Sequence, residues 1–112
     1  MSKTILITGA NGFIAKYLIN DCLESGYNVV LQSRSTIHDL RPGQRFIRGS
    51  FLHLCTDDIV DVDYIVHLAS AGVSPRKADW SLLNNINIAG ALKICQLAKD
   101  LSVPLIIAGS FA

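Results

Sequence analysis

Three small residues near the start of the chain have the spacing of an anion-binding loop. In "ILITGANGFIA", Gly9, Gly12 and Ala15 follow at intervals of three, between an apolar run and a helical pattern. Glycine at position 9 can take a tight turn with positive φ, and Gly12 has no Cβ to keep a diphosphate from the backbone. Amides at the helix start would bind the phosphate oxygens. The spacing favours a dinucleotide-binding loop, with an ordinary Gly-Asn turn as the alternative. The expected contacts here are Gly9, Asn11, Gly12, Phe13 and Ile14.

A serine and an arginine follow the second apolar run, in "VVLQSRS". Folds that bind NAD tend to place Asp or Glu at this point, where the carboxylate accepts hydrogen bonds from the ribose hydroxyls. Ser33 stands there instead, so no carboxylate would repel a 2′-phosphate, and the guanidinium of Arg34 could pair with one. The stretch therefore favours NADP over NAD. The alternative is that Arg34 is a solvated loop arginine.

Alternating strand and helix patterns must position these residues. Short β-branched runs without polar alternation indicate buried strands, and longer segments repeat apolar residues at helical spacing. We therefore expect an α/β fold, a Rossmann-type parallel sheet of five strands with helices on both faces, forming a single domain over residues 1–112. The expected strands are 4–8, 28–32, 45–48, 64–69 and 103–108, and the expected helices are 13–25, 54–61 and 80–101.

Some side chains that could take part in chemistry have a simpler structural explanation. Ile14, Leu18 and Cys22 share one stripe of the first helix, so the Cys22 thiol is expected to act as a small hydrophobe, and Cys95 on the long helix likewise. His67 ends the fourth strand, where a structural imidazole is favoured over a catalytic one.

Composition argues against several classes of protein. Half of the 112 residues are apolar, the net charge is +1, and no basic stripe is present, so neither nucleic acid nor an anionic membrane is an expected partner. No apolar run approaches the roughly 20 residues of a membrane span, and the N-terminus does not resemble a secretory signal. Three cysteines without CxxC spacing, and His38 and His53 without paired ligands, predict no metal site. We therefore expect a cytoplasmic protein.

Four segments together resemble the extended short-chain dehydrogenase/reductase family, in particular its NAD(P)-dependent nucleotide-sugar epimerases and dehydratases. They are "ITGANGFIA", "HLASAG", "NINIAGALKICQLA", which holds an Asn-x-x-Gly pattern at Asn87 to Gly90, and "LIIAGS". The resemblance implies a bound nicotinamide dinucleotide. It also implies reversible oxidation of a sugar carbon by hydride transfer, with a nucleoside-diphosphate sugar as the substrate of a full-length parent.

The resemblance also implies roles for residues at strand ends. The backbone at Leu68, Ala69 and Ser70 would run beside the nicotinamide ribose. Where the family often has Gly-Asp near the adenine, this chain has Gly-Ser, with Ser50 as the expected contact. Ser110 stands where the family uses Ser or Thr to hydrogen-bond the substrate hydroxyl, so it is the expected catalytic residue. The alternative for Ser110 is a strand-end serine that caps its own turn.

The acid/base pair of the resembling family is not found among the 112 residues. That pair is a Tyr-x-x-x-Lys segment, in which a phenolate takes the alcohol proton. None of Tyr17, Tyr27 and Tyr64 has a lysine four residues later. We expect the chain to stop before the last strands and the substrate lobe, and to have no turnover alone. The alternative is a stand-alone dinucleotide-binding or interaction module without turnover. The reading frame beyond Ala112 would separate the two.

Self-association, as a homo-oligomer, is a further expectation. The fifth strand should lie at an exposed sheet edge, which tends to pair with other chains. The helix 80–101 is apolar on two sides, and in the resembling family this helix lies at the dimer interface. One side holds Ile86, Ala89 and Lys93, and the other holds Ile88, Leu92, Cys95 and Ala98.

Overall fold

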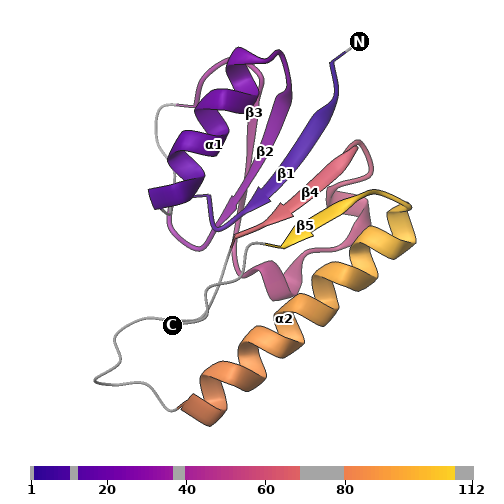
Figure 1. Cartoon of the computed structure of the whole chain (residues 1–112). Coiled ribbons are helices and arrows are strands. Elements are labelled where there is room, and N and C mark those ends of the chain that lie inside the picture. The colour runs from indigo at the N-terminus through magenta and orange to yellow at the C-terminus, as the bar shows by residue number, and fades with distance from the viewer. Residues whose placement is uncertain (1, 11–12, 37–39, 69–79, 108–112) are drawn as a thin grey trace.

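Five parallel strands form one sheet in the order β3-β2-β1-β4-β5 (Figure 1). The computed structural model describes residues 2–10, 13–36, 40–68 and 80–107. Two helices flank the sheet, α1 on one face and α2 on the other. The expected Rossmann-type fold is therefore confirmed, with β5 at an edge. The elements are β1 (Thr4–Thr8), α1 (Phe13–Glu24), β2 (Asn28–Ser33), β3 (Gln44–Arg48), β4 (Tyr64–His67), α2 (Trp80–Leu101) and β5 (Leu105–Ile107).

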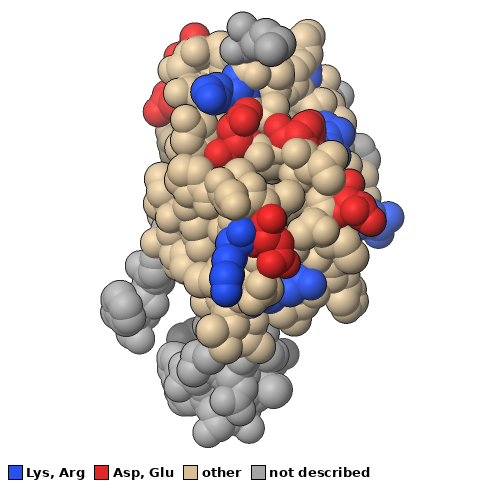
Figure 2. Space-filling model, turned by 90° about the vertical axis from the view of Figure 1, so that its right-hand side faces the viewer, with Lys and Arg blue, Asp and Glu red and all other residues tan. Residues whose placement is uncertain are grey.

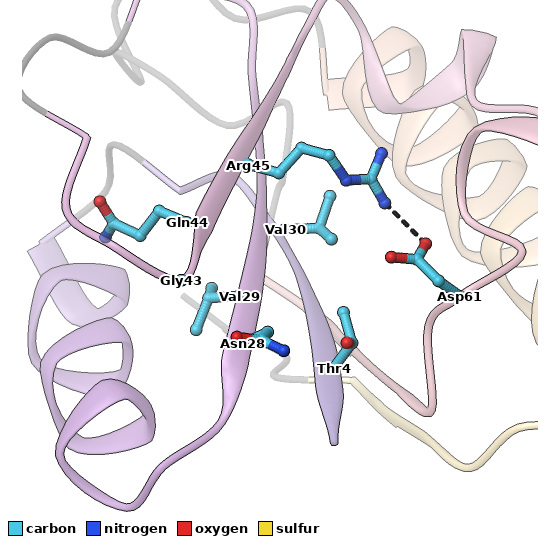
Figure 3. Close-up of a pocket in the computed structure, with 8 residues that line it drawn as sticks. All are labelled: Thr4, Asn28, Val29, Val30, Gly43, Gln44, Arg45 and Asp61. Carbon is cyan, nitrogen blue, oxygen red and sulfur yellow. Dashed lines mark hydrogen bonds and ion pairs between the residues drawn. The ribbon is translucent and has the colours of Figure 1, made fainter. Parts of the chain in front are cut away.

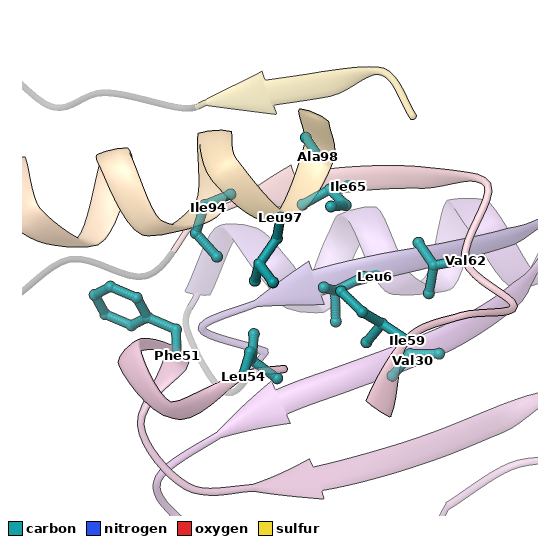
Figure 4. Packing of buried hydrophobic residues seen from close by; sticks show 10 residues of the cluster. All are labelled: Leu6, Val30, Phe51, Leu54, Ile59, Val62, Ile65, Ile94, Leu97 and Ala98. Atoms are coloured by element: carbon teal, nitrogen blue, oxygen red, sulfur yellow. The ribbon is translucent and has the colours of Figure 1, made fainter. Parts of the chain in front are cut away.

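The central strands are buried on both faces, which explains their unbroken apolar runs. Leu6 of β1 and Ile65 of β4 point towards α2, where they pack with Ile94 (Figure 4). Their neighbours along β1, Ile5 and Ile7, point to the other face and pack beneath α1. One hydrophobic core therefore lies on each side of the sheet.

Helix α1 buries a stripe that differs from the expected one. Ala15, Ile19 and Cys22 face the sheet and are buried, whereas Ile14 is 66% exposed. Of the apolar stripe expected at Ile14, Leu18 and Cys22, Ile14 therefore does not belong to the face that packs on the sheet. Ala15 is only 1% exposed, and its small side chain lets the helix pack closely against the sheet. The buried face of the helix is therefore centred on Ala15 and not on Ile14. The helix ends before Gly26, whose φ of 88° is typical of a glycine that terminates a helix.

The helix expected over residues 54–61 is not formed. A single 3₁₀ turn, Thr56–Asp58, stands within these residues instead, and another, Phe51–His53, precedes them. The Leu52 amide donates to Ser50 Oγ at 3.2 Å, and the Cys55 amide donates to Asp58 Oδ2 at 3.2 Å. Each of these bonds caps the start of its own turn, so the two turns begin separately.

Helix α2 also divides its faces differently from the expectation. Ile94, Leu97 and Ala98 are buried, so Ala98 belongs to the core face, while Leu92 is 66% exposed. Cys95, which was expected to act as a small hydrophobe, is also exposed. Cys22 is buried as expected, and burial, with a smaller contribution from Asp21, raises the pKa of its thiol. Among helices in the described ranges, none has the length and apolarity to cross a bilayer.

Candidate functional site

The carboxyl ends of β1, β2 and β4 meet at one edge of the sheet. Thr8, near the end of β1, is paired in register with Gln32 of β2 and with His67 of β4. The chain reverses its direction of winding at β1, because β2 and β3 lie on one side of it and β4 and β5 on the other. In open parallel sheets, ligands bind at this edge, beside the strand where the order reverses.

The first turn after β1 has the conformation predicted for a glycine loop. Gly9 has φ of 66°, a left-handed value that favours glycine. Its amide donates to Gln32 Oε1 at 3.1 Å, and the Ala10 amide donates to the Gln32 carbonyl at 2.9 Å. Ile14, in the first turn of α1, is exposed. Phe13 begins α1, while Asn11 and Gly12 lie outside the described residues.

At the end of β2, the structure separates the two predicted cofactor contacts. Ser33 is only 3% exposed, and its Oγ accepts a hydrogen bond from the Ser35 amide at 3.1 Å. The next residue, Arg34, is exposed. The serine hydroxyl therefore holds its own turn, and the arginine is the group with access to a ligand from solvent.

The turn after β3 is built around Gly49 and Ser50. Gly49 has φ of 135°, and its amide donates to the Ser33 carbonyl at 2.9 Å. Ser50 is half-buried, and its Oγ caps the following 3₁₀ turn by accepting from the Leu52 amide. This capping role was not predicted from the sequence.

His67 is held inside the protein, as the sequence suggested. It is 5% exposed, and its Nδ1 lies 2.7 Å from Thr8 Oγ1. The Leu68 amide donates to the same Thr8 oxygen at 3.0 Å. The ring of Phe51 meets the imidazole edge to face, with centroids 5.0 Å apart. Burial lowers the pKa of His67, which favours the neutral ring. The contacts of His67 therefore join β1 to β4 at the candidate site.

Two further residues at this edge make contacts that the sequence did not predict. Gln32 is 2% exposed, and its side chain reaches both Gly9 and Gly49. Gly90 of α2 faces Phe51, and a Cβ at this position would come within 2.2 Å of the ring. The only signals in the sequence were a glutamine at the end of an apolar strand and a glycine inside a helix. Neither signal predicts which residue lies in contact with it.

Several predicted residues cannot be placed relative to this edge. Ala69, Ser70 and Ser110 lie outside the described residues. Among the residues the structure does describe, no group of three His, Cys, Asp or Glu side chains is arranged to hold a metal ion.

A shallow hollow of about 200 Å³ lies at the opposite, amino end of the sheet (Figure 3). Arg45 and Asp61 form an ion pair of 2.7 Å at its rim. Acidic and basic side chains are also interspersed over the face shown in Figure 2. The hollow is distinct from the edge that carries the Gly9 turn. Its lining residues are Thr4, Asn28, Val29, Val30, Gly43, Gln44, Arg45 and Asp61.

Similar proteins share both the sequence and the fold. The dTDP-6-deoxy-L-talose 4-dehydrogenase (NAD(+)) of Aggregatibacter actinomycetemcomitans is 34% identical over 89 residues, covering 73% of this chain and 32% of that protein. The Bordetella bronchiseptica enzyme WbmH, solved in complex with NAD+, is 28% identical with a TM-score of 0.77, over 92% of this chain and 37% of its own. MoeE5, solved with UDP-glucuronic acid and NAD, is 28% identical with a TM-score of 0.81, over 96% of this chain and 36% of its own.

The chain spans about a third of the length of these relatives. The sequence pattern of the NAD dependent epimerase/dehydratase family matches residues 5–112, which is nearly the whole chain. The resemblance drawn from the glycine loop and the strand ends is thereby confirmed, and this chain belongs to the NAD dependent epimerase/dehydratase family.

Proposed function

We propose that this chain binds a nicotinamide dinucleotide at the carboxyl edge of its sheet, as the cofactor-binding portion of an oxidoreductase. The observation that carries the proposal is the Gly9 turn, which leaves a buried parallel strand at positive φ and leads towards the start of α1. Family membership supports the same conclusion, and the related WbmH and MoeE5 structures hold NAD+ and NAD.

The residues at this edge fit the parts of such a cofactor. The turn at Gly9 and the amides at the start of α1 would hold the diphosphate. Ser50 would lie towards the adenine, and the backbone from Leu68 to Ser70 towards the nicotinamide ribose. When bound, the dinucleotide supplies a hydride acceptor or donor.

We further propose that the dinucleotide is NADP. Ser33 stands where a carboxylate would repel the 2′-phosphate, and Arg34 beside it is exposed and able to pair with that group. The related structures named above carry NAD in their descriptions, so the support for NADP comes from the residues of this chain alone.

The whole protein would act on a sugar carbinol of a nucleoside diphosphate sugar, consistent with the activity named for the talose dehydrogenase and with the UDP-glucuronic acid bound to MoeE5. Ser110 would then hydrogen-bond the hydroxyl on the carbon that gives up its hydride to the cofactor. A serine hydroxyl cannot take the alcohol proton at neutral pH, so we expect no turnover from these 112 residues alone. The competing proposal is a binding or interaction module without turnover. The cytoplasm is the proposed location.

The proposal is tested by titrating the full 112-residue chain with NADPH and with NADH and following the reduced nicotinamide fluorescence. We expect saturable binding of one dinucleotide per chain, tighter for NADPH. A folded chain that binds neither compound would refute the proposed function. Tighter binding of NADH would refute only the assignment of NADP.

A further inference from the structure

One buried side chain at the carboxyl edge makes hydrogen bonds that the proposed function has not used. Gln32 is 2% exposed, and its amide spans two separate turns. Its Oε1 accepts a hydrogen bond from the Gly9 amide at 3.1 Å, and its Nε2 donates to the Gly49 carbonyl. The two turns follow β1 and β3, which flank β2 on either side. One side chain therefore bridges three adjacent strand ends.

From this geometry we infer that Gln32 is a positioning residue that fixes the adenosine half of the dinucleotide site before the ligand arrives. The inference rests on the proposed function. The Gln32 side chain, here called the clamp, would hold both the diphosphate turn at Gly9 and the turn at Gly49 proposed for the adenine. The nicotinamide half is proposed to bind after β4, outside the clamp.

Both turns need such a restraint because both are built on glycine. Gly9 has φ of 66° and Gly49 has φ of 135°. Glycine reaches many backbone conformations at little cost, so a glycine turn without a partner would sample several of them. Holding a loop in its bound shape strengthens binding because the ligand no longer has to order it.

The backbone around Gln32 reinforces the clamp on both sides. The Ala10 amide donates to the Gln32 carbonyl at 2.9 Å, and the Gly49 amide donates to the Ser33 carbonyl at 2.9 Å. The side-chain amide thus adds a second hydrogen bond to each of two existing backbone connections. Its removal would leave the Gly9 amide and the Gly49 carbonyl without these bonds while the sheet pairing remains.

The test compares the wild-type chain with Gln32→Met, which keeps a similar length and removes the amide. Gln44→Met is the matched control. Gln44 begins β3 at the amino end of the sheet, and its Oε1 accepts from the Arg41 amide. ADP serves as the probe for the adenosine half and nicotinamide mononucleotide as the probe for the other half, with both titrations followed by NMR.

We expect Gln32→Met to weaken ADP binding about tenfold, equivalent to about 1.4 kcal/mol, and to change nicotinamide mononucleotide binding by less than about twofold. Gln44→Met should change neither. A general loss of structure would weaken both probes alike. Equal losses, or no loss, in a folded Gln32→Met chain would therefore overturn the inference.

Amide hydrogen exchange in the wild-type chain gives a second test that needs no variant. The Gly9 amide should exchange slowly without ligand, and ADP should slow the exchange of Gly9 and Gly49 more than nicotinamide mononucleotide does. A Gly9 amide that exchanges as fast as one in an unstructured peptide would contradict the clamp. A wild-type chain with a protected Gly9 amide that binds no dinucleotide would instead refute the proposed function.

Discussion

Arg34 is the residue on which the proposed cofactor preference depends. A charge-assisted hydrogen bond to phosphate is worth roughly 1.5–3 kcal/mol. We therefore predict that Arg34→Ala lowers NADP affinity about tenfold or more and changes NAD affinity little. Arg41→Ala is the control, because Arg41 is also exposed but bonds to Asn20 of α1, away from the β2 end. Titration of both cofactors decides the matter, and an equal loss for both would rule out the role given to Arg34.

His67 should make the stability of the fold depend on pH. Burial lowers its pKa, so in the acid range the unfolded chain, with an imidazole pKa near 6.5, binds a proton that the folded chain does not. The contribution of neutral His67 to the free energy of unfolding is therefore complete above about pH 6.5. It is lost as the pH falls towards the lowered pKa of the folded state.

Urea unfolding between about pH 5 and pH 8 measures this dependence. His67→Asn should remove that part of the decline in acid, because the amide cannot titrate in this range. His53→Asn should keep it, because His53 is exposed. An unchanged pH dependence in the His67 variant would mean that His67 is not the responsible group.

At the scale of elements, the contact between α2 and the 3₁₀ turn at Phe51 leaves no room for a side chain at Gly90. A Cβ on Gly90 would lie 2.2 Å from Phe51 Cε2 and 2.7 Å from Cζ. The ring has little room to move, because it is buried and packs against His67. Overpacking a core typically costs about 1–3 kcal/mol, which exceeds the roughly 1 kcal/mol that alanine gains over glycine in a helix.

We therefore predict that Gly90→Ala lowers the free energy of unfolding in the wild-type background. In a Phe51→Leu background the clash is relieved, and the same change should be neutral or stabilising. A double-mutant cycle measured by urea unfolding tests both statements. The same loss in both backgrounds would show that the ring is not the obstacle.

The strands and the two long helices could be predicted because their cause is local. Unbroken β-branched runs and helical spacing are properties of neighbouring residues, and the glycine turn carries its own conformational requirement. The extent of the helix expected over 54–61 could not, because only the 3₁₀ turn Thr56–Asp58 forms there, capped by the Asp58 side chain. Gln32 and Gly90 were missed as bridging or contact residues because their partners are distant in sequence, with Gly9 23 residues from Gln32.

At the scale of the whole molecule, we propose that the chain self-associates through the outer face of α2 and the adjacent sheet edge. Leu92 of α2 is 66% exposed and Ile106 of β5 is 63% exposed. Light scattering at a protein concentration of tens of micromolar, which is suited to weak association, should show a species larger than a monomer. Leu92→Lys should shift it towards monomer, whereas Val60→Lys, at an equally exposed position elsewhere, should not. A monomeric wild-type chain under these conditions would contradict the proposal.

The central claim is that the dinucleotide binds at the carboxyl edge of the sheet. The most direct measurement is an NMR titration of the labelled full chain with NADP, followed at each backbone amide. We predict that the largest shifts fall at the carboxyl edge, on Gly9, Arg34, Gly49 and Leu68. Thr4, Asn28 and Gly43, which line the hollow at the amino end, should change little. Shifts concentrated at that hollow, or no shifts in a folded chain, would contradict the account.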